Sequence, residues 1–488
     1  MEHLLDKLKK NRDSGIYPYH MPGHKRRPFG ELNRELCGID ITEIDGFDNL
    51  HQSTGTLAQL QQQAARLYGA EESFYLVNGS TSGVLSAISA VLPQGGHILM
   101  ARNCHKSAYH GIYLRNLKVS YLYPPVLTGY DIFDAITLEQ IKMALEAEPK
   151  IGAVLIVSPT YEGRIADIRR IAEIVHERNI PLIVDEAHGA HLGLTEEGPE
   201  NSCKAGADLV IHSVHKTLPA LTQAALLHVN GSRIDREKLR RFLRIYQTTS
   251  PSYILMASID NALQFVELEG SEAFTEFAVN YGNMLEDLKS CKQLRILPWE
   301  TGRQDLGKLV ISVKDTGMTG KELYDILLHR YGLQLEMAAE SYVLAMFTVN
   351  DEPEGYKRMT LALLEIDHEL GRRNSSETSE VSKQDFMLFT KPVSKIPLTE
   401  AWDMETEETE LAKSAGRCVG EFINLYPPGV PVLVPGEEIT EELRVRIQGW
   451  IEGGLAVQGV EKRNDKIYIK VVKEAGGKMM FPAEKKSV

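Results

Sequence analysis

Short runs of branched apolar residues alternate with helical stretches between about residues 57 and 229. The runs have the length of buried strands, and the stretches between them have the length of helices. Strands that alternate with helices predict a mainly parallel sheet with helices on both faces, and such sheets bind ligands at the carboxyl ends of their strands. The predicted helices are Leu57–Tyr68, Val84–Val91 and Leu138–Ala147, and the predicted strands are Ser73–Val77, His97–Met100, Ala153–Val157, Leu182–Asp185 and Leu209–His212.

The pattern changes along the rest of the chain. Residues 237–277 are largely helical, and a second α/β pattern follows, with a strand over Leu309–Val313, a helix over Thr319–Tyr331 that Thr319 caps, and further strands at 335–337 and 342–348. A polar, serine-rich segment then has the composition of a linker. The predicted organisation is an N-terminal arm (1–50), a large domain (51–270), a small α/β domain (271–371), the linker (372–384) and a C-terminal α+β domain (385–488).

The composition is that of a globular protein. A chain of 488 residues, 43% hydrophobic and 25% charged, is long enough for two or three domains. Its net charge of −13 argues against nucleic acid or an anionic membrane as the main partner. The five scattered cysteines favour a reducing compartment over a disulfide framework or a zinc site. Because the N-terminus lacks a signal-peptide core and no apolar run approaches the roughly 20 residues of a membrane span, we expect a cytoplasmic protein.

Two segments carry the most specific chemistry. Asp185 ends the apolar run Ile180–Asp185, and Lys216 follows Ser213-Val-His215 just beyond the next predicted strand. A pyridoxal phosphate enzyme needs both groups: an amine that holds the cofactor as a Schiff base, and a carboxylate that keeps the pyridine nitrogen protonated. The alternatives are an ordinary strand-end carboxylate and a surface lysine, but apolar or small residues flank Lys216 on both sides.

Three further patterns bear on this site. A small-residue turn, Asn78-Gly-Ser-Thr-Ser-Gly83, follows a predicted strand and opens a helix. Its backbone N–H groups and the hydroxyls of Ser80, Thr81 and Ser82 suit a phosphate. The alternative is a plain helix start, which has the same pattern. His105 follows another strand, where it could stack on a cofactor ring or be an ordinary loop histidine. His188 and His191 have a metal-ligand spacing, but a third ligand with suitable spacing is lacking, so we expect no metal.

These motifs together resemble the Orn/Lys/Arg decarboxylases, fold-type-I pyridoxal phosphate enzymes of the aspartate aminotransferase-like fold, and in particular the short Gram-positive type that lacks an N-terminal wing domain. The resemblance covers nearly the whole chain. Pro219 departs from it, since the family usually has a small residue there. The matching segments are residues 20–25, 42–51, 79–83, 102–107, 158–163, 185–189, 213–216, 222–225 and 426–431.

The resemblance implies a role for each matching residue. Lys216 would form the internal aldimine, Asp185 would pair with the pyridine nitrogen, and His105 and Ala187 would lie on opposite faces of the ring. His188 would lie near cofactor and substrate. The phosphate contacts would come from Ser80, Thr81, Ser213 and His215. The family is built from dimers, so the resemblance also implies a homodimer or higher oligomer with shared active sites, in which Thr248 and Ser250 approach the phosphate of the partner subunit.

The expected reaction is α-decarboxylation of a basic amino acid, with Lys216 or His188 returning a proton to Cα. Arginine and lysine are equally compatible with the sequence, and ornithine ranks behind them. Glu336 is the first candidate for the carboxylate that binds the distal cation, because related decarboxylases have an acidic residue there; Glu340, Asp45, Asp48 and Glu162 follow. The rival functions are another pyridoxal phosphate reaction, such as transamination, and a cofactor-binding regulator without catalysis.

Overall fold

The computed structural model describes residue 15, residues 17–19, residue 43 and residues 48–195, 198–374, 391–427 and 429–473. They form two compact units, one before residue 389 and one after it. Asp45, most of the predicted N-terminal arm and most of the predicted linker lie outside the described residues. In the described part, none of the helices combines the length and the apolar character of a membrane span.

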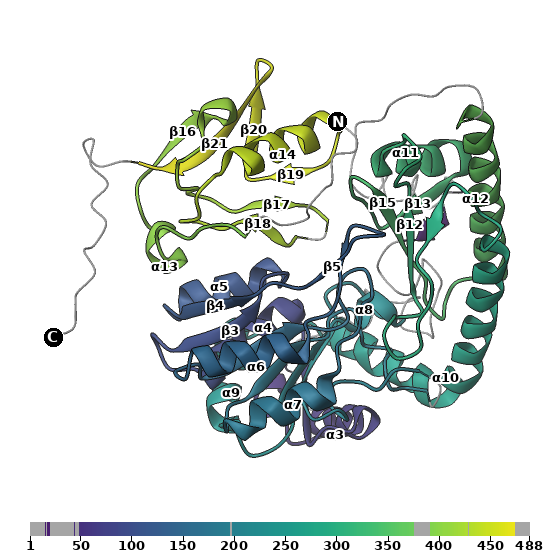
Figure 1. Ribbon diagram of the computed structural model, residues 1–488. Helices are drawn as coiled ribbons and strands as arrows, with labels where there is room; N and C mark the ends of the chain where they lie inside the picture. Colours follow the sequence, from purple (N-terminus) through teal and green to yellow (C-terminus); the bar gives the residue numbers. More distant parts are fainter. Residues whose placement is uncertain are drawn as a thin grey trace. The chain divides into compact units, whose positions relative to one another are not determined.

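A seven-stranded sheet forms the centre of the first unit (Figure 1). Neighbouring strands are parallel from β9 through β8, β7 and β3 to β4, and β10 is antiparallel to both of its neighbours. The mainly parallel α/β sheet predicted from the sequence is therefore confirmed. In spatial order the strands are β2 (Glu72–Leu76), β10 (Ala225–Val229), β9 (Leu209–His212), β8 (Leu182–Asp185), β7 (Ala153–Val157), β3 (His97–Ala101) and β4 (Lys118–Leu122).

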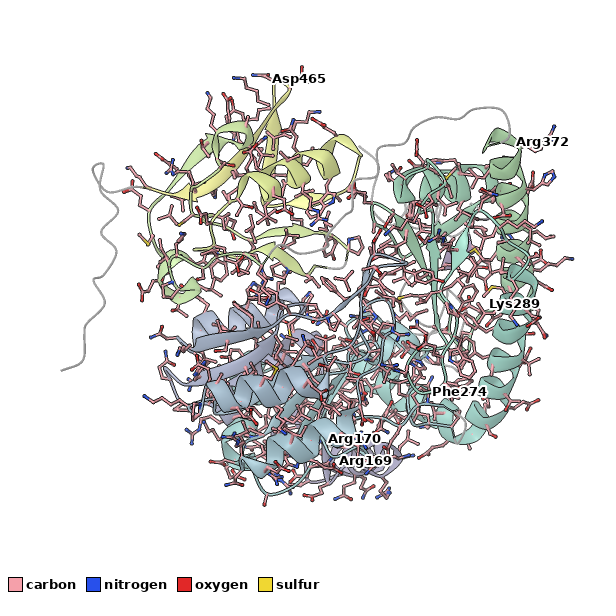
Figure 2. All side chains as sticks on the ribbon, viewed as in Figure 1. Arg169, Arg170, Phe274, Lys289, Arg372 and Asp465 are labelled. Atoms are coloured by element: carbon pink, nitrogen blue, oxygen red, sulfur yellow. The ribbon has the colours of Figure 1, made fainter. Side chains whose placement is uncertain are left out.

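Helices form two groups beside this sheet. One group consists of α4 (Gly79–Val91), α5 (Lys106–Leu114) and α9 (Arg236–Tyr246), in which α4 packs against the other two. In the other group α6 (Leu138–Ala147) packs against α7 (Ile168–Glu177). On the outer side of α7, Arg169 and Arg170 are exposed (Figure 2), while the opposite side of the same helix is buried, as its apolar spacing requires. The remaining helices of this part are α3 (Thr56–Tyr68) and the single turn α8 (Val214–Thr217).

A second, smaller sheet follows the 36-residue helix α10 (Tyr253–Leu288). Its strand order is β11 (Arg295–Ile296), β12 (Lys308–Ser312), β15 (Tyr342–Met346) and β14 (Met337–Ala338). The predicted helix is α11 (Gly320–Tyr331), and Thr319 caps it in a capping box with Glu322. The long helix α12 (Pro353–Asn374) was not predicted from the sequence.

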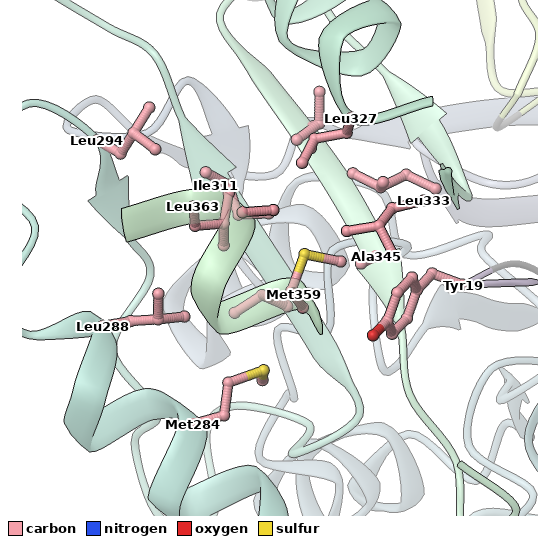
Figure 3. Close-up of a cluster of buried hydrophobic side chains, with 14 of the residues drawn as sticks. Tyr19, Met284, Leu288, Leu294, Ile311, Leu327, Leu333, Ala345, Met359 and Leu363 are labelled. Carbon is pink, nitrogen blue, oxygen red and sulfur yellow. The ribbon is translucent and has the colours of Figure 1, made fainter. Parts of the chain in front are cut away.

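One apolar core joins these elements of the small domain (Figure 3). Met284 and Leu288 of α10 face Met359 and Leu363 of α12, with Ile311 of β12 close by. Strand β1 (Tyr17–Tyr19) pairs in parallel with β13 (Leu333–Leu335) and buries Tyr19 completely in the same core. The N-terminal segment therefore contributes to the small domain from the opposite end of the chain.

The second unit has two small antiparallel sheets and a core of its own. Leu443, Ile447 and Trp450 of α14 (Glu441–Glu452) belong to that core. One sheet consists of β16 (Thr406–Glu410), β21 (Lys466–Val472) and β20 (Val460–Arg463), and the other of β18 (Pro431–Leu433), β17 (Ile423–Leu425) and β19 (Val457–Gln458).

Gly83 lets α4 approach the large sheet closely. A Cβ atom at this buried position would lie 2.7 Å from Leu76 Cδ1 and 3.1 Å from Ile211 Cγ2. Both atoms belong to core side chains without exposure. A larger residue would therefore push the helix, and the loop at its N-terminus, away from the strands.

We predict that Gly83→Ala lowers the free energy of unfolding by about 1–3 kcal/mol, because overpacking outweighs the higher helix propensity of alanine. Gly282 in α10 is a matched control, since nothing lies within 4 Å of a Cβ placed there. Gly282→Ala should raise the free energy of unfolding by about 0.5–1 kcal/mol. Chemical denaturation measures both changes, and equal effects of the two substitutions would contradict the packing argument.

Candidate active site

The carboxyl ends of β8 and β9 carry the two residues on which the sequence prediction rests. Asp185 is the last residue of β8, and its Oδ1 accepts a hydrogen bond of 3.2 Å from the Ala187 N–H. Lys216 lies in α8, directly after β9. Because β8 and β9 are parallel neighbours, both residues lie at the same edge of the sheet, as predicted.

His188 lies between two lysine amines. Its Nε2 is 2.9 Å from Lys216 Nζ, and its Nδ1 is 2.8 Å from Lys308 Nζ. Lys308 is the first residue of β12, so the small domain contributes it, and it is only 2% exposed. The sequence interpretation missed this residue; a lysine directly before the apolar run Leu309–Val313 was the available signal.

Burial and charge shift the pKa values of these groups. Burial lowers the pKa of Lys216, while the negative charges of Asp185 and Glu336 oppose this shift. Burial also lowers the pKa of Lys308 to about 8. For His188, burial and the nearby lysines hold the pKa well below its usual value, so the imidazole ring is neutral.

Asp185 itself is a buried carboxylate that needs a cation. Burial raises its pKa, and the charge of Lys216 and the Ala187 N–H lower it. A protonated ring nitrogen near this carboxylate would supply the missing positive partner. The next residue, Glu186, faces other groups: it accepts hydrogen bonds from Ser202 and pairs with His212 of β9 at 2.7 Å, which fixes the loop that carries Ala187 and His188.

His105 is the N-cap of α5. Its Nδ1 accepts the Ser107 N–H at 3.2 Å, which leaves the proton of the neutral ring on Nε2. Burial, followed by the charge of Lys216, lowers the pKa of His105 to about 3. A neutral ring near Lys216 suits the stacking role that the sequence predicts.

The N-terminus of α4 offers donors to an anion. Its N-cap, Asn78, makes no side-chain capping bond, so the first N–H groups of the helix, at Ser80 and Thr81, remain available. Ser82 differs from the other predicted phosphate ligands, because its hydroxyl donates to the Gly79 carbonyl oxygen at 2.8 Å. Its backbone N–H could still serve an anion.

Ser213 and His215 precede Lys216. Ser213 is fully buried, and its Oγ has no hydrogen-bond partner among the described residues. A buried hydroxyl without a partner costs free energy unless a ligand satisfies it. The His215 side chain lies 3.0 Å from the Ala224 carbonyl oxygen through Nδ1, and this contact fixes its ring.

Glu336 lies between β13 and β14, and its Oε1 accepts a hydrogen bond from the Tyr161 hydroxyl. The Tyr161 ring packs edge-on against His188, with centroids 4.6 Å apart. The charge of Glu336 raises the pKa values of both Lys216 and Lys308, so this carboxylate lies within electrostatic reach of both amines.

The other predicted acidic residues have different surroundings. Asp48 accepts backbone N–H groups of the segment Asn49–Ala58, which makes it a loop-fixing residue. Glu162 is buried, accepts the Tyr342 hydroxyl at 2.8 Å, and has a pKa raised by burial. Glu340 accepts the Gly320 N–H through its backbone oxygen.

Three other predicted positions also lie near the site. His191 Nε2 is 2.8 Å from Asp305 Oδ1, so this histidine has a carboxylate partner from the small domain. Thr248 and Ser250 are exposed, and the Thr248 N–H donates to Asn78 Oδ1 at 3.4 Å. Thr248 thus lies beside the N-terminus of α4 in its own chain.

Taken together, these residues fit pyridoxal phosphate. The fit consists of phosphate donors at α4 and at the partnerless Ser213 hydroxyl, a carboxylate at Asp185, and an amine of depressed pKa at Lys216. A lowered pKa increases the fraction of free amine, which is the nucleophile in Schiff-base formation.

Two family models match the chain: "Orn/Lys/Arg decarboxylase, major domain" over residues 3–303, and "Orn/Lys/Arg decarboxylase, C-terminal domain" over residues 385–450. The arginine decarboxylase of Bacillus subtilis (strain 168) is 31% identical, and the alignment covers 96% of this chain and 98% of the relative. The constitutive lysine decarboxylase of Escherichia coli (strain K12) is 23% identical over 97% of this chain and 81% of the relative.

Solved structures show the same fold. Lysine decarboxylase A from Pseudomonas aeruginosa superposes with a TM-score of 0.77 at 19% identity, covering 96% of this chain and 79% of that one. A serine palmitoyltransferase from Sphingomonas wittichii gives a TM-score of 0.57 at 17% identity, covering 73% and 88% of the two chains. The fold, family and cofactor predicted from the sequence are confirmed. The chain therefore belongs to the Orn/Lys/Arg decarboxylase family of pyridoxal-phosphate-dependent enzymes that decarboxylate basic amino acids.

Proposed function

We propose that this enzyme decarboxylates arginine, with Lys216 holding the cofactor and Asp185 pairing with its ring nitrogen. The observation that carries the assignment of Lys216 is its position: a partly buried amine, 2.9 Å from a neutral histidine, at the same sheet edge as Asp185. Bound pyridoxal phosphate supplies an electron sink for the electrons released from the Cα–carboxylate bond. Asp185 maintains that sink by keeping the ring nitrogen protonated.

The other residues position the reactants. His105 and Ala187 would hold the ring from its two faces, and the phosphate would be held by Ser80, Thr81, Ser213 and His215. The N–H of Ser82 adds a backbone donor at the same helix end. His188 lies beside Lys216, where a proton must be delivered once the carboxylate has left.

The choice of arginine rests on the relatives and on Glu336. Several relatives with 30–31% identity over most of the chain are named arginine decarboxylases, whereas those named lysine decarboxylases are 22–23% identical. Glu336 has the charge to bind a guanidinium, and the Tyr161 hydroxyl holds its carboxylate in a fixed orientation. An oriented carboxylate favours the planar guanidinium, which can form two parallel hydrogen bonds with it.

We also propose a homodimer in the cytoplasm. The exposed segment 248–250 beside Asn78 supports a shared active site, because it is available to an adjoining subunit. Three buried thiols, Cys104, Cys203 and Cys418, suit a reducing compartment. Sedimentation of the holoenzyme tests the assembly, and a monomer at assay concentration would contradict it.

Lys216→Ala should abolish the visible absorbance of the Schiff base between lysine and cofactor and lower amine production by about 10³-fold. Lys204→Ala removes another lysine of the large domain, one that donates to the Gly193 carbonyl oxygen, and should preserve both properties. Assays of CO₂, amine and keto acid then separate the possible reactions. Keto acid without CO₂ would mean transamination, and cofactor binding without turnover in the wild type would mean a regulator.

Ser213→Ala should weaken cofactor binding by about 10-fold, because it removes a charge-assisted hydrogen bond to the phosphate. Ser82→Ala is the matched control. Its hydroxyl donates to the Gly79 carbonyl oxygen, so its loss should change affinity much less. Titration of each apoenzyme with pyridoxal phosphate measures the dissociation constants. A larger loss with Ser82→Ala than with Ser213→Ala would reverse our assignment of the phosphate ligands.

Glu336→Gln should lower kcat/KM for arginine by about 10–100-fold, since it removes the charge that pairs with the guanidinium. Glu340→Gln, which changes the other acidic side chain of this segment, should have little effect. The measurement is agmatine formation by each variant, with lysine and ornithine as competing substrates for the wild type. A higher kcat/KM for lysine than for arginine would contradict arginine as the substrate. A larger effect of Glu340→Gln than of Glu336→Gln would contradict the proposed role of Glu336.

A further inference from the structure

Both ring nitrogens of His188 face lysine amines. Lys216 Nζ lies 2.9 Å from Nε2, and Lys308 Nζ lies 2.8 Å from Nδ1. A neutral imidazole has one N–H donor and one acceptor nitrogen, while an ammonium group can only donate. Two ammonium groups therefore cannot both bond to this ring. One of the two lysines must be a neutral amine that accepts the imidazole N–H.

The carboxylates around Lys308, together with the cofactor role of Lys216, make Lys308 the charged partner. Three carboxylates, those of Asp305, Glu336 and Glu162, act on Lys308 and favour its ammonium form. Its pKa of about 8 keeps it mainly protonated at neutral pH. The pKa of Lys216 is lowered as well, although Asp185 and Glu336 favour its ammonium form. Lys216 is the lysine that gives up its proton when it binds the cofactor, and this leaves Lys308 as the ammonium partner. Nδ1 of His188 thus accepts from Lys308, and the Nε2 proton points at Lys216.

Packing fixes Lys308 in this position. A Cβ atom at Gly163 would lie 2.7 Å from Lys308 Cγ and 2.8 Å from Gln304 Nε2, so the loop after β7 closely covers the lysine stem. The Tyr161 ring lies under the amine, with its centroid 5.5 Å from Nζ. These contacts hold the ammonium group in one place against His188, which suits a proton donor to that ring.

We propose that Lys308 and His188 form a proton relay that returns a proton to the substrate Cα after CO₂ has left. This inference rests on the proposed roles of Lys216 and His188. Because the substrate amine would take the place of Lys216 on the cofactor, the Nε2 proton of His188 would lie beside the reacting atoms. Lys308 acts through the histidine and does not touch the substrate.

The relay balances in protons and charge. The electron pair left on Cα takes the proton from Nε2, which breaks the Nε2–H bond and forms a C–H bond. At the same time Nδ1 takes a proton from the Lys308 ammonium. His188 begins and ends neutral with its tautomer inverted, and Lys308 ends as an amine that solvent reprotonates when the product leaves. The net donor is an ammonium group rather than a neutral imidazole, whose N–H alone is a very weak acid.

The relay predicts how activity depends on pH. The charged and titratable groups that act on His188 are Lys216, Lys308, His215 and His105. The groups that favour the ammonium form of Lys308 are Asp305, Glu336 and Glu162. Since the ammonium form is the active one, kcat should fall as the pH rises through about 8, where Lys308 loses its proton. Replacement of Lys308 should remove that limb of the profile.

Two substitutions of Lys308 distinguish a role in proton transfer from a purely electrostatic role. Lys308→Met keeps an unbranched stem without a proton, and Lys308→Arg keeps a charged donor that does not release its proton. Both should lower kcat by about 10²-fold. Both should also raise the fraction of turnovers in which the proton goes to the cofactor carbon, which yields an aldehyde and the amine form of the cofactor. Lys314→Met, which removes a half-buried lysine bound to Asp131, is the control and should change neither quantity.

The second measurement uses apoenzyme. With ¹⁵N-labelled histidine, and with His188→Gln to assign the signals, NMR should show His188 protonated on Nε2 in the wild type. Lys308→Arg should retain this tautomer, and Lys308→Met should lose it. The spectra do not depend on turnover, so they test the Lys308 contact even if arginine is not the substrate. Thermal unfolding of each variant checks that it is folded.

Each result has a defined consequence. The expected result is a lower kcat in both Lys308 variants. The Nε2-protonated tautomer of His188 should be kept in Lys308→Arg and lost in Lys308→Met. Recovery of kcat and of the product ratio in Lys308→Arg would make Lys308 a purely electrostatic support and overturn the relay. Unchanged kcat and product ratio in Lys308→Met would leave Lys216 as the proton donor. An unchanged His188 spectrum in Lys308→Met would show that Lys308 does not set the tautomer.

Discussion

A buried ionisable group must be either neutral or paired, and this constraint governs the whole site. Asp185, Glu162, His188 and Lys308 are buried, and Lys216 is partly buried beside them. Desolvation makes the Lys216 amine easier to deprotonate, keeps His188 neutral and leaves Asp185 in need of a cation. The same physical effect therefore supports the three proposed roles: nucleophile for Lys216, proton carrier for His188 and partner of a pyridinium ring for Asp185.

The fold brings these groups together from distant parts of the chain. The parallel strands β8 and β9 place Asp185 and Lys216 at one sheet edge, and the loop after β8 carries His188. Strand β12 of the small domain adds Lys308, and the segment between β13 and β14 adds Glu336. The candidate active site is thus built by the large and small domains together, and His188 contacts one lysine from each of them.

The sequence predicted the parts of the site that belong to local motifs. Asp185 and Lys216 each follow an apolar run, so their place at a strand end could be inferred. Lys308 could not be inferred in the same way, because its meaning depends on contact with His188 across two domains. Strands β4 and β10 were missed for related reasons: β4 is only partly buried, and His228 interrupts β10, where contacts with Ser73 and His212 satisfy it in the folded state.

Chemical trapping of the cofactor tests the central claim most directly. Borohydride reduction of the holoenzyme, followed by proteolysis and mass spectrometry, identifies the lysine that carries the cofactor. The position of Lys216 at the same sheet edge as Asp185 predicts the pyridoxyl label on the peptide that contains Lys216, and an unlabelled Lys308. A label on Lys308, which is also a buried lysine of depressed pKa, would contradict the account, because the two amines on His188 would then have exchanged roles.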